Sequence, residues 1–376
     1  MRHRTRIAMA ALGCAAIVTV SRPAPAPAIY HGGAIDPSQV PWLVTLTAHS
    51  VVCGGALIAP DRVVTAAHCV QGVAPAHLRV RLGGGALRDT RELQWSGAVF
   101  SPQYHTVPSP AAPGDPTRAA SIDDVAVLIL AQPVPDVPPV PVAQAAPADG
   151  DVSWTVGHGR TGPRLGTRDP GRPPQTPRVA VQRVVPMATC EQAYGRGLLD
   201  PGRHLCTEDP AGTGAQACAG DSGSPVLVPT AAGFTLTAVV AWGGEVRGRD
   251  CGQGLPDVSE RLLPHADLLA AAAAPQPSIA PYAEQRVRVR RSGTQRLCVI
   301  GPWQPAGTTF TVRWWRLGPR RKVRDPRTGR QIIVSGRRTD LPGGGVTRSV
   351  RRGRIGCSVT ARTPGGWATE DSYNAL

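Results

Sequence analysis

The clearest chemical signal in the chain is the run CAGDSGSP, which extends from Cys218 to Pro225. A serine hydroxyl such as that of Ser222 is a poor nucleophile at neutral pH and needs an adjacent base. Histidine has the unperturbed pKa nearest to neutral pH, so His68, in the sequence TAAHC, can take the proton and return it to a leaving amine. The two residue types predict nucleophilic acyl transfer.

A third motif, DVAVL from Asp124 to Leu128, lies between the histidine and the serine. The three motifs, in the order His, Asp, Ser, resemble those of the chymotrypsin/trypsin-like serine proteases. The resemblance implies a triad of His68, Asp124 and Ser222, in which the aspartate orients the imidazole and stabilises the imidazolium. It also implies an oxyanion hole made by the backbone N–H groups of Gly220 and Ser222.

Two adjacent aspartates, Asp123 and Asp124, compete for the triad position. Neighbouring residues in a strand face opposite ways, so only one of them can reach His68. The family pattern of Asp followed by Val/Ile-Ala-Leu/Val selects Asp124. We interpret Asp123 as a solvated charge at a strand end.

Residues 1–28 resemble a secretory signal peptide. Arginines near the start precede an apolar run from Ile7 to Val20, which is too short for a comfortable membrane span, and small residues surround Ala28. Export and an extracellular location are therefore expected.

Cleavage after Ala28 would expose a new N-terminus at Ile29, with the sequence IYHG. This resembles the mature start of the family, in which a free Ile amine pairs with the aspartate before the nucleophile, here Asp221. Because an alanine rather than a basic residue precedes Ile29, we expect the signal peptidase itself to produce the active form.

Eight of the nine cysteines lie after the signal segment, an even number that is expected of an exported, oxidised protein. Spacing alone does not give their connectivity. The resemblance implies the pairs Cys53–Cys69, Cys190–Cys206 and Cys218–Cys251, and it leaves Cys298 and Cys357 for each other.

The chain has 376 residues, enough for two domains. Short Val/Leu/Ile runs separated by Gly and Pro favour an all-β structure, and the resemblance implies two antiparallel six-stranded β-barrels for residues 29–274. A helix is expected over Leu262 to Ala274, as in the family. Residues 275–282 form a Pro-rich linker, and residues 283–376 form a second domain.

Substrate preference is where the sequence departs from trypsin. By resemblance, Gln216 lies at the floor of the specificity pocket, where trypsin has Asp, and Asp257 lies on the back wall in place of Gly. The pocket strand contains Ala241, Trp242 and Gly243. Two interpretations remain open: Asp257 offers a displaced anionic site for a basic side chain, or it narrows the pocket and bonds to Gln216. We favour the second, which predicts small or medium uncharged residues at the cleaved position.

The C-terminal region contains RLC, TFTVRWW and IGCSVT segments that resemble bacterial immunoglobulin-like sandwiches. Alternation along its central strand places Phe310, Val312 and Trp314 on a core face and Trp315 on the exposed face. This region has 20 basic and 5 acidic residues. Seven of the basic residues are expected near one hairpin: Arg313, Arg316, Arg320, Arg321, Lys322, Arg324 and Arg327. They indicate either a surface for an anionic polymer or a solvated basic face.

The sequence therefore predicts a secreted serine endopeptidase that acts on proteins or peptides through an acyl-enzyme intermediate. It needs no cofactor, and its histidines show no metal-ligand spacing with Cys, Asp or Glu, so no metal is expected. Nucleic acid is the least expected partner because no aromatic stacking platform is present. The alternative is a catalytically weak, protease-like secreted binding or adhesion protein that acts through its basic C-terminal domain.

Overall fold

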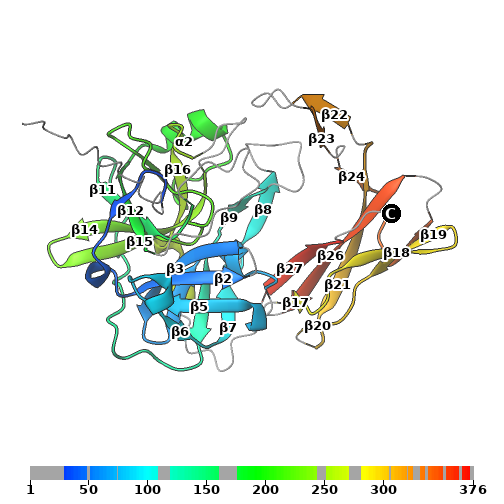
Figure 1. The fold of residues 1–376 in the computed structure, drawn as a ribbon, viewed down its shortest axis with the longest axis horizontal. Coiled ribbons are helices and arrows are strands. Elements are labelled where there is room, and N and C mark those ends of the chain that lie inside the picture. The colour runs from blue at the N-terminus through cyan, green and yellow to red at the C-terminus, as the bar shows by residue number, and fades with distance from the viewer. Residues whose placement is uncertain are drawn as a thin grey trace, which may run out of the picture.

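The computed structural model describes residues 29–48, 51–73, 75–108, 119–160, 176–243, 251–270, 281–304, 306–319, 321–324, 331–334, 338–349, 353–363 and 366–372. The expected signal peptide and most of the expected linker lie outside these residues. Figure 1 shows two β-structured bodies in the N-terminal part and a further group of sheets towards the C-terminus. No helix among the described residues is long and apolar enough to cross a membrane.

The second of the two N-terminal bodies, which contains the strands β11 to β16, is a closed barrel of six antiparallel strands, as expected. Its order is β12-β11-β14-β15-β16-β13, β13 pairs back to β12, and the short β1 (Gly33–Ala34) lies outside on β12. The strands are β11 (Val152–Gly157), β12 (Arg178–Val184), β13 (His204–Glu208), β14 (Pro225–Thr230), β15 (Gly233–Gly243) and β16 (Asp257–Arg261).

The first body differs from the expected six-stranded barrel, because it is a half-barrel with the order β6-β5-β2-β3-β4-β10-β7. Its two edge strands, β6 and β7, follow each other in the chain with Gln94 between them, so one bent segment supplies both edges. The strands are β2 (Leu43–Ala48), β3 (Val51–Ala59), β4 (Arg62–Thr65), β5 (Leu78–Leu82), β6 (Arg91–Leu93), β7 (Trp95–Phe100) and β10 (Ala126–Leu130), and a separate hairpin joins β8 (His105–Pro108) to β9 (Ala119–Ile122).

The helices are short. They are η1 (Pro37–Gln39), α1 (Ala67–Val70), η2 (Pro75–His77), η3 (Leu87–Asp89), α2 (Met187–Tyr194), η4 (Leu263–His265) and α3 (Ala266–Ala270). The expected C-terminal helix is thus present but shorter within the described chain. Its Leu269 packs into the core, and the Arg62 guanidinium of β4 donates to the Leu269 carbonyl at 3.0 Å. One apolar cluster extends from the first body into the second, so the two share a core. The half-barrel and the closed barrel are called the first and the second barrel below.

The C-terminal region has two main antiparallel sheets, β18-β19-β25 and β24-β21-β26-β27, and two smaller pairs, β17-β20 and β22-β23. The strands are β17 (Tyr282–Ala283), β18 (Arg288–Ser292), β19 (Gln295–Val299), β20 (Trp303–Gln304), β21 (Thr309–Leu317), β22 (Arg321–Arg324), β23 (Gln331–Val334), β24 (Arg338–Leu341), β25 (Thr347–Ser349), β26 (Arg354–Thr363) and β27 (Gly366–Asp371). The Cys298–Cys357 disulfide joins β19 to β26 and so connects the two sheets.

Strand alternation along β21 predicted the burial of two apolar residues correctly and that of two others wrongly. Trp314 is fully buried and Val312 nearly so, as expected, but Phe310 is 43% exposed and Trp315 is buried. Trp315 lies opposite Gly356 in the β21–β26 register, and a Cβ on that glycine would come within 2.1 Å of the Trp315 ring. Because Gly356 has no side chain, the Trp315 indole can pack directly over it and is buried against the sheet.

Candidate active site

His68 lies in the one-turn helix α1, which begins directly after β4. Its Nδ1 atom is 2.6 Å from Oδ2 of Asp124, and its backbone N–H donates to Oδ1 of the same carboxylate at 2.9 Å. Asp124 is fully buried between β9 and β10, and its carbonyl accepts from the Ala67 N–H at 3.2 Å. The Cys53–Cys69 disulfide attaches the α1 turn to β3. The imidazole is therefore held in one orientation by the carboxylate that the sequence selected.

The pKa of His68 is raised above its ordinary value of 6.5. Burial acts to lower this pKa, but the negative charge of Asp124 and the hydrogen bond to it act in the other direction and prevail. A histidine that binds a proton more readily is a stronger base towards a neighbouring hydroxyl. The side chain keeps about a third of its surface exposed, so a substrate can approach it.

The loop that carries Ser222 comes from the second barrel and lies against the first. The Gly54 N–H of β3 donates to the Ser222 carbonyl at 2.7 Å, and the Gly223 N–H donates to the Val240 carbonyl at 2.7 Å. Gly223 has a φ of 75°, and a Cβ there would lie 2.3 Å from Oγ1 of Thr65. Because Gly54 neighbours Cys53, these contacts bring Ser222 beside the disulfide that holds the His68 turn.

The turn before the nucleophile is shaped by Gly220, whose φ of 101° lies in the region that favours glycine. A Cβ on Gly220 would approach the Gly159 Cα to 3.1 Å. The Asp221 N–H donates to the Cys218 carbonyl at 2.9 Å, and the Cys218–Cys251 disulfide anchors the base of the turn. The assignment of the Gly220 and Ser222 amides to an oxyanion hole stays a prediction.

Asp221 is a buried carboxylate that is bound by backbone groups. Its Oδ1 accepts from the Gly159 N–H at 2.7 Å, and its Oδ2 accepts from the Cys218 N–H at 2.9 Å. Burial raises the pKa of Asp221 to about 7, even though both hydrogen bonds act to lower it. A Cβ on Gly159 would lie 2.1 Å from Oδ2, so this carboxylate fills the space that the glycine leaves. A nearby positive charge would stabilise the ionised form of this carboxylate and lower its pKa.

The Ile29 side chain is fully buried in the second barrel, packed with Ala180 and Ala215. The next residue, Tyr30, exchanges two backbone hydrogen bonds of 3.1 Å with Gln216. The structure therefore inserts the predicted mature start into the barrel, beside the segment that leads to Asp221. The pairing of the Ile29 amine with Asp221 stays a prediction.

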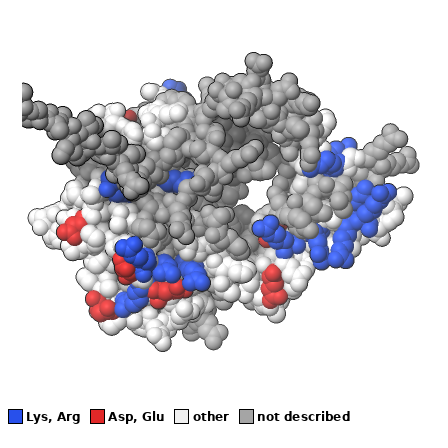
Figure 2. Space-filling view, viewed as in Figure 1, with Lys and Arg blue, Asp and Glu red and all other residues white. Residues whose placement is uncertain are grey.

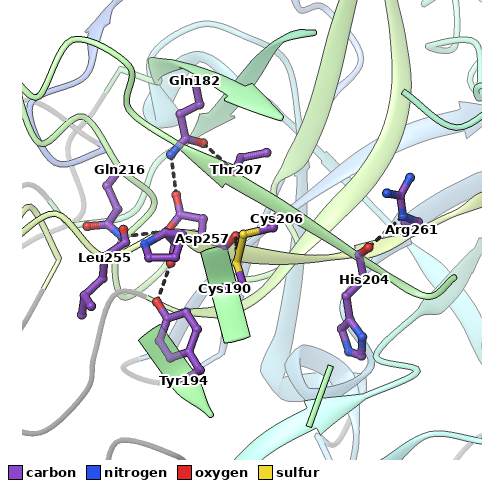
Figure 3. The surroundings of a disulfide bond; sticks show 11 residues. Gln182, Cys190, Tyr194, His204, Cys206, Thr207, Gln216, Leu255, Asp257 and Arg261 are labelled. Atoms are coloured by element: carbon purple, nitrogen blue, oxygen red, sulfur yellow. Dashed lines mark hydrogen bonds between the residues drawn. A yellow bond between two sulfur atoms is a disulfide. The ribbon is translucent and has the colours of Figure 1, made fainter. Parts of the chain in front are cut away.

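Gln216 and Asp257 meet, as Figure 3 shows. Nε2 of Gln216 donates to Oδ1 of Asp257 at 3.0 Å and to the Leu255 carbonyl at 2.6 Å, and its Oε1 accepts from the Gly252 N–H at 2.6 Å. Oδ2 of Asp257 accepts from Nε2 of Gln182 at 2.8 Å and from the Ala217 N–H at 3.0 Å. The Asp257 carboxylate is thus engaged by three N–H donors inside the wall.

Burial raises the pKa of Asp257 to about 6, against the effect of its hydrogen bonds. Ala241, Trp242 and Gly243 lie on β15, as the resemblance implies, where Gly243 pairs with Asp257 in register. The Trp242 ring meets the Tyr194 ring edge-on, with 5.1 Å between ring centroids. The predicted pocket residues therefore lie next to one another in one wall of the second barrel.

Sequence reasoning missed Gln182, which binds Asp257, Thr155 and Thr207 from inside the barrel. A signal was present, because strand alternation puts Gln182 on the same face as Ala180 and Val184, the face that the structure buries. A polar residue at such a position needs a buried partner.

The interpretation of Asp123 as a solvated charge is wrong. Asp123 is 3% exposed, and its carboxylate accepts a hydrogen bond from Nη1 of Arg203. Its φ of 53° turns the side chain away from the direction expected of a regular strand. Two further residues missed by the sequence reasoning, Glu260 and His265, lie in the same buried cluster.

The chain matches the family model Trypsin over residues 29–263. It is 32% identical to the vitellin-degrading protease of Bombyx mori over 57% of this chain and 75% of that protein. It is also 32% identical to a trypsin of Saccharopolyspora erythraea, over 58% of this chain and 85% of that protein. Among solved structures, neuropsin, a serine protease of mouse brain, matches 65% of this chain and all of its own length, with 25% identity and a TM-score of 0.52.

Proposed function

Because the chain belongs to the trypsin family and is a serine-type endopeptidase, we propose that it hydrolyses peptide bonds through His68, Asp124 and Ser222. The observation that carries the proposal is the double contact between His68 and Asp124, at 2.6 and 2.9 Å, beside the loop of Ser222. The Ser222 oxygen attacks the scissile carbonyl while His68 takes its proton. His68 then returns the proton to the departing amine, which leaves an acyl-enzyme for water to hydrolyse. The backbone amides of Gly220 and Ser222 receive the oxyanion.

Labelling by a fluorophosphonate tests this proposal directly, because such reagents react with an activated serine. We expect covalent labelling of the processed protein and none of the Ser222→Ala variant. The alternative, a catalytically weak binding protein, is not favoured by the match to proteases or by the His68–Asp124 contact. Failure of correctly processed protein to label would restore it.

We also propose that the protein is exported and becomes active when the Ile29 amine is released. The disulfides of the described chain suit an oxidising compartment. The inserted Ile29 and the buried, backbone-bound Asp221 support the activation step, since a free ammonium at Ile29 would neutralise a carboxylate that burial otherwise disfavours.

For the residue at the cleaved bond we propose a preference for small or medium uncharged side chains. This preference is supported by Gln216 and Asp257, whose polar side-chain atoms are hydrogen-bonded to each other or to neighbouring groups of the protein. In a panel of fluorogenic peptides, we expect Val or Leu at that position to be turned over faster than Arg. The charge-removing variant Asp257→Asn should keep this order, whereas dominant turnover of Arg that collapses in Asp257→Asn would show that Asp257 serves as an anionic site.

The C-terminal sheets support a proposal for an anionic polymer as partner. Arg291, Arg296 and Arg348 face one another across three neighbouring strands. Among the described residues none of them forms an ion pair with an acidic side chain, and Nε of Arg296 is buried without a hydrogen-bond partner. Figure 2 shows Lys and Arg side chains over these sheets with few acidic ones among them, whereas on the barrels they lie among Asp and Glu. Like charges directly opposite in a sheet are unfavourable unless a counter-charge joins them.

This arginine row differs from the hairpin cluster that the sequence predicted. Arg313 and Arg316 are exposed on β21, and the remaining members of that cluster have side chains outside the described part of the structure.

The test is retention of full-length Ser222→Ala protein on a dextran sulfate column. Changing Arg291, Arg296 and Arg348 together to glutamine should lower the salt needed for elution, because exposed charges are screened by salt. A matched triple change of Arg79, Arg88 and Arg91, exposed on the barrels and near acidic partners, should have a much smaller effect. Equal shifts for both triples would reject the row as the binding surface.

A further inference from the structure

A buried cluster of charged residues lies behind the triad, and the proposed catalytic step does not use it. Asp123 belongs to the segment between β9 and β10, Glu260 to β16 and His265 to η4. All three side chains are less than a tenth exposed, and Glu260 is fully buried. One ligand-type atom from each lies within 4.8 Å of the other two. The first barrel and the second barrel thus bring a carboxylate–carboxylate–imidazole set together.

The cluster is incompletely satisfied by hydrogen bonds. Within the described residues, both carboxylate oxygens of Glu260 and Nε2 of His265 are buried without a hydrogen-bond partner. Nε2 of His265 lies 3.9 Å from Oε1 of Glu260 and 3.8 Å from Oδ1 of Asp123, and Nε2 of His204 lies 3.6 Å from Oε2 of Glu260. Buried polar atoms without partners are rare and require an explanation, such as an ion.

We propose that Asp123, Glu260 and His265 form a binding site for a divalent transition-metal ion of the Zn²⁺ type. Carboxylate oxygens and an imidazole nitrogen bind Zn²⁺ at about 2.0–2.2 Å, which places donor atoms of a tetrahedral site about 3.4 Å apart. The separations of 3.8 and 3.9 Å from His265 to the two carboxylates need to close by about half an ångström. The ligand oxygens of Asp123 and Glu260 lie within 4.8 Å of each other and would also have to approach. The imidazole donor favours Zn²⁺ over Ca²⁺ or Mg²⁺, which prefer oxygen.

The neighbours of the site have definite roles. His204, also fully buried, would orient Glu260 through its free oxygen, as outer partners commonly do for metal ligands. Arg203 is the competitor, because its guanidinium now binds the Asp123 oxygen that the ion would use. Its side chain is a third exposed, so it can swing outward. Metal and Arg203 therefore compete for the same carboxylate.

Such a site would join the two barrels directly behind the catalytic aspartate. Asp123 precedes Asp124 in the chain, whereas Glu260 lies in the last barrel strand and His265 lies between that strand and α3. An ion that binds the folded state alone raises its stability by mass action. This inference goes beyond peptide hydrolysis and does not depend on it.

The experiment uses full-length Ser222→Ala protein, which cannot digest itself, after removal of metals by a chelator. We expect one equivalent of Zn²⁺ to bind in calorimetry and to raise the melting temperature, and bound Co²⁺ to give the visible spectrum of a tetrahedral site. Glu260→Gln and His265→Asn should each lower the affinity at least about 100-fold. Arg203→Gln should raise it about tenfold, because a competing cation is removed.

His105→Asn, at an exposed histidine, and His68→Ala should leave the affinity unchanged and so exclude surface or triad binding. A variant that fails to fold would lose affinity for Zn²⁺. The higher affinity expected of Arg203→Gln therefore cannot result from misfolding. Absence of stoichiometric binding, equal affinity in Glu260→Gln, or weaker binding in Arg203→Gln would each overturn the proposal.

Discussion

Replacement of Ser222 by alanine is expected to lower kcat for peptide hydrolysis by about 10⁶-fold, with KM little changed. The reason is that no acyl-enzyme can form without the hydroxyl, while the contact between Gln216 and Asp257 in the predicted pocket stays intact. Steady-state kinetics of purified, processed protein measure the loss. His68→Ala should cost about as much, and the double variant little more than either single one, because the residues act as a unit.

The pH profile provides an independent control on the same site. His68 must be neutral to accept the serine proton, so kcat/KM should fall as pH falls through a pKa above 6.5. Asp124→Asn removes the charge that raises this pKa, so the acid limb should move to lower pH while the rate drops. An unshifted limb in Asp124→Asn, or activity that survives in Ser222→Ala, would contradict the assigned triad.

The second large effect concerns the chain start. Protein that begins at Ile29 should be fully active, whereas protein that retains Ala28 and cannot be trimmed should lose about 10²- to 10⁴-fold in kcat/KM. Breaking a buried ion pair from one side costs about 3–5 kcal/mol, which corresponds to this range. Asp221→Asn in the mature protein should lose a similar factor. Ile29→Val keeps the amine and serves as the matched control, with a small effect expected.

Stability should report the same pairing with a definite sign. In the untrimmed chain the pKa of Asp221 rises from 3.8 to about 7 on folding, so the folded state holds its proton more tightly than the unfolded state. The free energy of unfolding should therefore fall as pH rises from 3.8 to about 7, by roughly 4 kcal/mol at most.

In the mature protein the new amine offsets that loss. Its raised folded pKa makes the stabilisation complete below about 7.8 and lost as pH rises through the higher folded value. An N-terminal sequence other than Ile29 in active protein, or equal activity with Ala28 retained, would reject this activation.

The sequence determined the reaction, because the chemistry resides in short local motifs whose residue types and order are visible without coordinates. His68, Asp124 and Ser222 are each embedded in a characteristic run of neighbours. The disulfide pairs followed from the same resemblance, and the structure joins the same cysteines. The burial of Trp314 followed from strand alternation, which depends on local geometry alone.

Only the tertiary structure decided which polar groups lost their water and met each other. Asp123 is solvated in a strand-end interpretation but buried once Arg203, Glu260 and His265 converge on it from distant segments. Gln182 meets Asp257 inside the second barrel for the same reason. Trp315 was misplaced because its burial depends on a glycine about 40 residues away in the chain. Solvation and contact depend on the path of the whole chain, and no local pattern contains that path.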